Sequence, residues 1–296
     1  MGTPDFAIPS LKILIENNHQ ILAVVTTPDK ERGRGQKITF TAVKQFAIEN
    51  GIPVYQPEKL KGNTELVEQM KSLNPDLFVV VAFRILPKEV FEIPKLGSFN
   101  LHGSYLPKYR GAAPIQWALI NGDSETGLTT FKLAEKVDTG NIYLKEKIQI
   151  NPDDNFETLH DRMSLLGAEL VLKTVQLIEE GNYELQQQND SLASPAPKIT
   201  KEICLIDFKK PAEEIHNLVR GLSPHPVAFF NYNNKVIKIY KTEIIKDIKL
   251  NPSEFHHTKT ELLIGCGKDA IRILEIQQEG KKRMSIEEFL RGFSFT

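Results

Sequence analysis

The sequence predicts an α/β protein, in which a Rossmann-like, doubly wound, mostly parallel sheet is followed by a small OB-like β-barrel domain. Strand patterns and helix patterns alternate over the first two-thirds of the 296 residues, an order typical of a parallel sheet covered by helices on both faces. After Gly181 the composition changes to polar residues and prolines. The last 94 residues then hold short strand-like runs, which favour a small barrel with attached helices.

Each expected element of the first part depends on the spacing of its apolar residues. Uninterrupted β-branched or apolar runs, and one run of alternating apolar residues, predict strands. These strands are 21–27, 53–55, 77–82, 98–102, 127–134 and 142–150. Apolar residues three or four positions apart predict helices. These helices are 11–15, 42–47, 66–73, 114–120 and 156–171.

The C-terminal part is expected to contain one helix over 211–221, a capped helix beginning at Ser285, and four strands. These strands are 228–232, 236–241, 262–266 and 270–276. We therefore divide the chain into three parts, and the composition change places the linker between the two domains. The parts are an α/β domain at 1–180, a linker at 181–202 and an OB-like domain at 203–296.

Composition narrows the classes of protein. Apolar residues make up 41% of the chain, and no apolar run approaches the roughly 18 residues of a membrane span. Pro4 and Asp5 stand where a signal peptide needs apolar residues, so a cytoplasmic location is expected. Two cysteines cannot form a disulfide framework or a zinc cluster by themselves. The net charge is -1, but residues 201–296 carry 16 Lys/Arg against 13 Asp/Glu, which is compatible with a phosphate-bearing partner.

Polar side chains are expected to converge where the strand at 98–102 ends. Asn100 and His102 are two residues apart and so project from the same face, and ligands of open α/β sheets bind beyond the carboxyl ends of strands. Asp138 follows a later strand. Two hydrogen-bond donors for an oxyanion, with a carboxylate that orients the imidazole, suit acyl or formyl transfer. For His102 alone, a hydrogen-bonded histidine before an ordinary turn is the simpler interpretation.

Several motifs together resemble the folate-dependent formyltransferases. They are MGTPDFAIPSL, TTPDKERGRGQK, NLHGSYLPKYRGAAPIQWALINGD, ETGLTTFKL with VDTG, and GKKRMSIEEFLRG. The resemblance covers essentially the whole chain. It implies that a formyl group passes from 10-formyltetrahydrofolate, a co-substrate, to the α-amino group of methionine on initiator tRNA for translation initiation. It implies no metal ion, no membrane and no obligate protein partner.

The resemblance also assigns roles to residues. Asn100 and His102 would bind the formyl oxygen, while Asp138 would orient His102 and place a water that relays the amine proton. The tetrahydrofolate-contacting segment would consist of Ser104, Tyr105, Leu106 and Pro107. The tRNA phosphates would be contacted from a basic loop by Lys30, Arg32, Arg34 and Lys37.

Three features depart from the family pattern. Arg84 stands where the folate-wall segment usually has a glycine and one further residue, so this loop is expected to take another path. Tyr105 replaces a leucine. The chain begins directly on the first glycine turn, without the strand that normally precedes it in a doubly wound sheet. We therefore expect Met1 to be an internal methionine of a longer natural chain.

Two alternatives stay open. The formyl group could pass to another acceptor, such as a nucleotide-sugar, glycinamide ribonucleotide or water. The protein could also be an inactive tRNA- or folate-binding module. The basic loop and the C-terminal barrel favour tRNA as the acceptor, and the intact Asn100, His102 and Asp138 favour an active enzyme.

Overall fold

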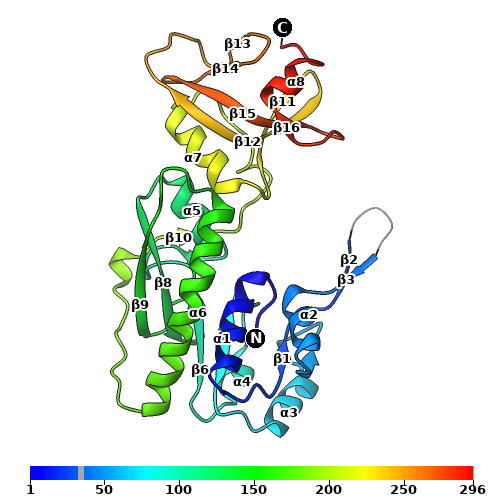
Figure 1. Cartoon of the computed structure of the whole chain (residues 1–296). Helices are drawn as coiled ribbons and strands as arrows, with labels where there is room; N and C mark the ends of the chain where they lie inside the picture. Colours follow the sequence, from blue (N-terminus) through cyan, green and yellow to red (C-terminus); the bar gives the residue numbers. More distant parts are fainter. Residues whose placement is uncertain (33–36, 296) are drawn as a thin grey trace. The chain divides into compact units, whose positions relative to one another are not determined.

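The chain divides into two compact units, and the computed structural model describes residues 1–32 and 37–295 (Figure 1). The first unit consists of Met1–Gly111, Gly127–Ile148 and His160–Pro195. The second unit consists of Ala112–Thr126, Gln149–Leu159 and Ala196–Thr296. Both units are assembled from separated stretches of sequence, and the continuous boundaries expected above stay a prediction.

The first unit is an α/β unit with a main sheet of order β5-β6-β8-β9 and a separate β1-β4 pair. These strands are β1 (Val24–Val25), β4 (Val54–Tyr55), β5 (Phe78–Val81), β6 (Ser98–His102), β8 (Glu125–Lys132) and β9 (Ile142–Gln149). The helices are η1 (Asp5–Ala7), α1 (Ile8–Glu16), α2 (Ala42–Glu49), α3 (Thr64–Ser72), α4 (Lys88–Phe91), α6 (Phe156–Glu180) and η2 (Asp190–Leu192). Two short ladders join β2 (Lys30–Arg32) to β3 (Lys37–Thr39) and β7 (Arg110–Gly111) to β10 (Pro195–Ala196).

β6 lies inside the main sheet and carries the candidate site. It runs parallel to β5, with Asn100 opposite Val80, and antiparallel to β8. The sheet is therefore mixed around β6 rather than mostly parallel, because the connection to β8 brings the chain back against the direction of β6. A Cβ atom on Gly167 of α6 would lie 2.7 Å from Leu101 Cδ2. A glycine at this position therefore lets α6 pack closely on β6.

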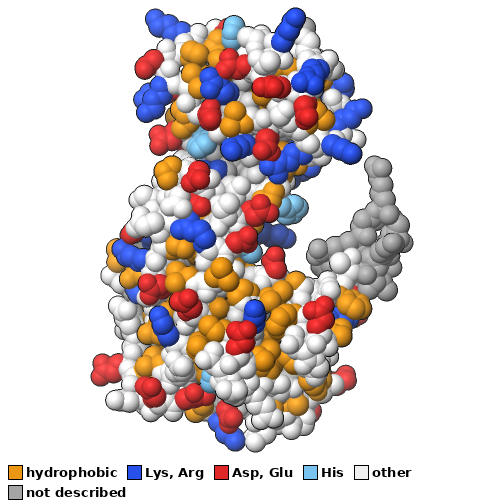
Figure 2. Space-filling model, in the orientation of Figure 1, with side chains coloured by type: hydrophobic (Ala, Val, Ile, Leu, Met, Phe, Trp, Pro, Cys, Tyr) orange, Lys and Arg blue, Asp and Glu red, His pale blue; other side chains and the backbone are white. Residues whose placement is uncertain are grey.

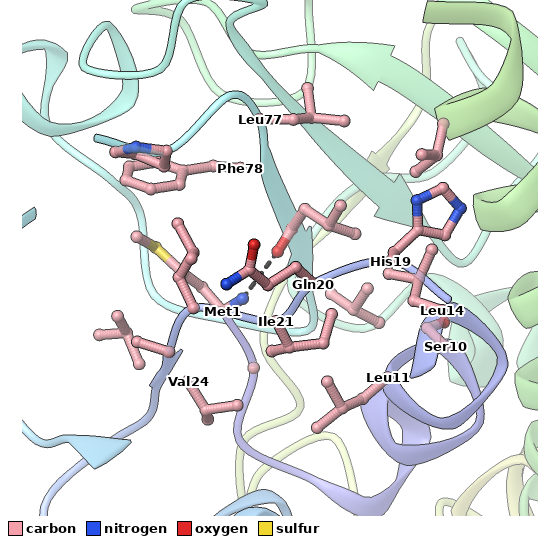
Figure 3. Close-up of a pocket in the computed structure, with 18 of the residues that line it drawn as sticks. Met1, Ser10, Leu11, Leu14, His19, Gln20, Ile21, Val24, Leu77 and Phe78 are labelled. Atoms are coloured by element: carbon pink, nitrogen blue, oxygen red, sulfur yellow. Dashed lines mark hydrogen bonds between the residues drawn. The ribbon is translucent and has the colours of Figure 1, made fainter. Parts of the chain in front are cut away.

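β1 is shorter than the strand that the sequence predicts. The β-branched run extends over 21–27, but only Val24–Val25 is a strand. Residues 20–24 border a cavity of about 290 Å³ that separates them from residues 77–79, at the start of β5 (Figure 3). A strand depends on hydrogen-bonded neighbours, and the first part of this run faces the cavity instead.

The second unit is mainly antiparallel β structure. Its sheet has the order β11-β12-β15-β14-β13, and β16 pairs with β15. The strands are β11 (Ala228–Tyr232), β12 (Lys235–Ile245), β13 (Phe255–His257), β14 (Leu262–Gly265), β15 (Ala270–Gln278) and β16 (Met284–Ser285). The helices are α5 (Pro114–Ile120), α7 (Ala212–Leu222) and α8 (Ile286–Leu290).

One apolar core holds the second unit together. Ile215, Val219 and Leu222 lie on one side of α7 and join the same buried cluster as Ile239 of β12 and Ile273 of β15. These helix residues recur at intervals of three and four, so α7 presents a continuous apolar stripe to the sheet. Among the described residues, no helix of either unit has the length and apolar character needed to cross a membrane.

Candidate functional site

β6 brings the two predicted hydrogen-bond donors to one end of the sheet. Asn100 and His102 alternate with the buried Phe99 and Leu101 along the strand, so their side chains project from the same face. Asn100 is half-buried and His102 is buried. The strand ends at His102, so the imidazole lies at the carboxyl end of β6, as the sequence predicts.

Both ring nitrogens of His102 face oxygen atoms of the chain. Nε2 lies 2.8 Å from the Tyr109 carbonyl oxygen, and because a carbonyl only accepts, Nε2 carries the hydrogen and donates it. Nδ1 lies 3.8 Å from Asp138 Oδ2, which is beyond hydrogen-bond distance. The imidazole is therefore oriented by a short bond on one nitrogen and a nearby carboxylate on the other.

Asp138 is held in place by the backbone of the neighbouring loop. Its Oδ2 accepts a hydrogen bond from the Gly111 N–H at 2.9 Å. Asp138 and Tyr109 have φ angles of +54° and +61°, a left-handed conformation that is uncommon outside glycine. Both residues that face His102 thus adopt unfavourable backbone conformations, a feature that clusters at functional sites.

Gln188 connects the two loops that flank His102, and the sequence analysis did not identify it. Its amide nitrogen donates to the carbonyl oxygens of Asp138 at 3.0 Å and Gly140 at 2.8 Å. Its Oε1 accepts from Arg110 Nε and Nη2 at 3.1 and 2.7 Å. Gln188 falls in the segment expected to be a linker. The sequence feature that could have drawn attention to this contact is its partner Arg110, which belongs to the RGAAPIQ motif.

The segment predicted to contact tetrahydrofolate directs two of its side chains inward. Ser104 and Leu106 are fully buried, and the Leu106 N–H donates to Thr129 Oγ1 at 3.0 Å. Tyr105 stacks with a lysine of β9, whose ammonium lies 4.2 Å from the ring centroid. Pro107 follows, and its carbonyl accepts a hydrogen bond at 3.4 Å from the chain after η2. The Leu106 N–H and the Pro107 carbonyl are therefore used to hold this loop.

Arg84 bonds to the chain itself. Its Nη1 and Nη2 donate to the carbonyl oxygens of Glu58 and Pro57 at 2.8 and 2.6 Å. Burial lowers the pKa of its guanidinium below the ordinary value. Ala82, two residues earlier, has a φ of +47°. Arg84 thus anchors the loop after β5 to the segment after β4.

Three of the four residues predicted to contact tRNA lie on one hairpin. In it, Lys30, Arg32 and Lys37 belong to the antiparallel strands β2 and β3. Arg34 lies outside the described residues, and so do the side chains of the other three. At the base of the hairpin Asp29 accepts hydrogen bonds from Lys44 and Gln56. The Lys44 bond, followed by the Gln56 bond, lowers the pKa of Asp29.

The basic cluster near the C-terminus is partly paired with acidic residues. Arg283 forms an ion pair with Glu275, and its guanidinium lies 4.4 Å from the Tyr240 ring centroid. Lys281 and Lys282 are exposed. Figure 2 shows charged side chains of both signs spread over the second unit. This face therefore offers individual lysines rather than one uniformly positive surface.

Comparisons with known proteins cover almost the whole chain. Residues 1–175 match the formyl transferase family, and residues 198–294 match its C-terminal domain. A methionyl-tRNA formyltransferase of Caldanaerobacter subterraneus is 48% identical over 294 residues, which cover 99% of this chain and 95% of that protein. One of Clostridioides difficile is 47% identical, with the same two coverages. A solved N-formyltransferase from Helicobacter canadensis has the same fold, with a TM-score of 0.67 at 24% identity over 96% of this chain and 97% of that chain.

The two matched regions and the α/β unit define the class: the chain belongs to the formyl transferase family. Its identity to full-length relatives places it among the methionyl-tRNA formyltransferases. Its activity is therefore that of these relatives, the transfer of a formyl group to methionyl-tRNA.

Proposed function

We propose that this protein transfers the formyl group of 10-formyltetrahydrofolate to the α-amino group of methionyl-initiator tRNA. The observation that carries the proposal is the convergence of Asn100, His102 and Asp138 at the carboxyl end of β6. It occurs in a chain that is similar over its full length to methionyl-tRNA formyltransferases. The bound folate supplies the formyl group, and the residues of the chain bind and orient it.

The donor set suits a formyl group. As the amine attacks the formyl carbon, negative charge develops on the formyl oxygen, and the Asn100 amide and the His102 ring N–H are suitable donors to it. The Nε2 hydrogen of His102 is directed at the Tyr109 carbonyl. The substrate oxygen can receive this hydrogen only if it replaces that carbonyl. We therefore expect the loop that carries Tyr109 to move when substrate binds.

Asp138 acts through His102 and on the attacking amine. Its carboxylate faces Nδ1, where it orients the imidazole. The attacking amine must be neutral and must lose a proton, and we assign to Asp138 the water that relays this proton. Holding the amine next to the formyl carbon contributes much of the rate acceleration.

We assign the remaining contacts to segments on both units. The tetrahydrofolate-contacting segment is Ser104, Tyr105, Leu106 and Pro107, and the tRNA phosphates are bound by Lys30, Arg32, Arg34 and Lys37. We also propose that the first unit is a doubly wound, Rossmann-like domain and that the antiparallel sheet of the second closes into an OB-like barrel that contacts tRNA. The hairpin of β2 and β3 and the basic excess of residues 201–296 support these assignments.

A formylation assay tests the proposal directly. The purified protein should formylate methionine on initiator tRNA in the presence of 10-formyltetrahydrofolate, and it should prefer initiator to elongator tRNA. Asn100→Ala and His102→Ala should each lower kcat by about 10²-fold or more, as the loss of an oxyanion donor does. The exposed residues Asn182 and His256 provide matched alanine controls, which should keep full activity.

Three results would contradict these assignments. Product formed with a nucleotide-sugar amine but not with methionyl-tRNA would show that the acceptor is different. Near-normal turnover in both Asn100→Ala and His102→Ala would remove their assignment. For the hairpin, neutralising Arg32 and Arg34 together should flatten the salt dependence of tRNA binding by about two phosphate contacts and leave folate affinity unchanged. An unchanged slope contradicts the contact.

A further inference from the structure

The peptide unit between Tyr109 and Arg110 lies between His102 and the segment after η2. Its carbonyl oxygen accepts from His102 Nε2 at 2.8 Å. The N–H of the same unit, that of Arg110, donates to Ser194 O at 2.8 Å. Because the peptide unit is planar and its carbonyl and N–H point in opposite directions, one rigid group connects the imidazole to Ser194. The carbonyl therefore cannot turn away from His102 while the N–H keeps its bond to Ser194.

Ser194 also holds the peptide unit before this one. Its Oγ accepts a hydrogen bond from the Tyr109 N–H at 2.9 Å, and its own N–H donates to Pro107 O at 3.4 Å. Tyr109 has a φ of +61°, and a residue with a side chain keeps this conformation only where its surroundings impose it. Ser194 supplies this constraint, because it binds the N–H groups on both sides of the Tyr109 carbonyl carbon. It thereby fixes the direction of that carbonyl.

The neighbouring parts of the loop are held by other residues. Before Tyr109, Thr129 Oγ1 accepts from the Leu106 N–H at 3.0 Å and donates to Ser104 O at 2.7 Å. After it, the Gly111 N–H donates to the Asp138 carboxylate at 2.9 Å. The two ends of the loop are thus anchored separately. A movement that uncovers the imidazole can therefore be confined to the peptide units that Ser194 holds.

We propose that Ser194 is a positioning residue that holds the Tyr109 carbonyl against His102 in the free protein. Release of the two hydrogen bonds that Ser194 accepts lets this carbonyl turn away, and the Nε2 hydrogen of His102 then becomes available to the formyl oxygen. The use of this hydrogen rests on the proposed function. Ser194 acts through Tyr109 and does not itself touch the substrate. Since the covered form must open first, the Ser194 bonds reduce the apparent affinity for the formyl donor.

Two measurements on Ser194→Ala test the proposal. With isotope-labelled histidine, NMR follows the exchange of the His102 Nε2 hydrogen with water in the free protein. This exchange should be faster by about fivefold, the effect of one neutral hydrogen bond on an equilibrium. The Kd for 10-formyltetrahydrofolate, measured without tRNA, should fall by about the same factor, and kcat for formylation should not fall.

Two variants serve as controls. Ser194→Thr keeps the hydroxyl that accepts from Tyr109, so both the exchange rate and the Kd should return to the parent values. The exposed Ser191 lies in the same segment, but its Oγ bonds to Asn189 Oδ1 within its own turn at 2.8 Å. Ser191→Ala should therefore change neither quantity.

Two results would overturn the proposal. Unchanged exchange of the His102 Nε2 hydrogen in Ser194→Ala would show that Ser194 does not hold the carbonyl in place. A higher Kd with a lower kcat, both restored in Ser194→Thr, would show that Ser194 holds the loop in its binding form instead. The exchange is measured on the free protein, so it tests the contact whatever the acceptor is. Absence of formyl donor binding by the parent would contradict the proposed function, whereas faster exchange in Ser194→Ala would still support the contact.

Discussion

Replacing Gln188 by leucine tests whether the segment after α6 positions Asp138, the carboxylate that we assign to catalysis. The Gln188 side chain donates to the carbonyls of Asp138 and Gly140 and accepts from Arg110. Leucine has a similar size but offers none of these polar atoms. The substitution therefore leaves the turn that contains Asp138 without its hydrogen-bonding support and changes the volume of the side chain little.

The size of the effect follows from the bonds that are lost. Two neutral hydrogen bonds contribute about 1 kcal/mol each, and a bond from a guanidinium contributes about 1.5–3 kcal/mol. Arg110 keeps Asp190 as a partner at 2.7 Å, which reduces that last contribution. Gln188 is 8% exposed, so water has little access to the carbonyls that lose their donor. We expect the free energy of unfolding to fall by about 3 kcal/mol and kcat/KM to fall by about tenfold or more.

Urea denaturation and formylation kinetics measure the two effects separately. Gln188→Glu keeps an acceptor for Arg110 but loses the amide hydrogens, so its activity should lie between those of the parent and Gln188→Leu. The exposed neighbour Gln187 provides a matched control, because Gln187→Leu should change neither quantity. The reasoning is refuted if Gln188→Leu unfolds within about 0.5 kcal/mol of the parent, the range of surface substitutions, and keeps its kcat/KM.

Two further predictions concern backbone packing and a thiol. A Cβ atom on Gly140 would lie 1.7 Å from Lys132 O, so Gly140→Ala should lower the free energy of unfolding, measured by urea denaturation, by about 3 kcal/mol or more. Gly292 lies in open space, so Gly292→Ala should lower it by about 1 kcal/mol or less. Equal losses of stability in the two variants would count against the clash. Burial raises the pKa of the Cys266 thiol to about 11, so only about one thiol in a thousand is ionised at pH 8. Cys266 should therefore be labelled slowly in the folded protein, and rapid labelling of this thiol would contradict the prediction.

The spacing of apolar residues predicted those helices and strands whose buried face can be recognised from a few neighbouring residues. The bounds expected for β6, α5 and β11 coincide with those of the structure, because apolar periodicity identifies a buried face without knowledge of the partner. The strand expected over 21–27 is reduced to Val24–Val25. Its residues have suitable side chains, but strand formation also depends on a hydrogen-bonded neighbour, and a cavity lies there instead.

The sequence also predicted only part of the candidate site. A spacing of two along one strand placed Asn100 and His102 on one face, and the turn motif identified Asp138 from the sequence. No sequence pattern indicated that His102 Nε2 donates to Tyr109. The side chains of Ser104 and Leu106 also pack inward, although all four residues of their segment were expected at the folate.

By itself, the sequence determined the family of this protein, the order of most of its elements and the three side chains that we assign to catalysis. Only the tertiary structure decided what each nitrogen of His102 faces and that Gln188 joins Arg110 from 78 positions away. The reason is physical. Periodicity and turn chemistry act between neighbours along the chain, whereas a hydrogen bond between distant residues requires a distance and an angle that exist only after the elements have packed.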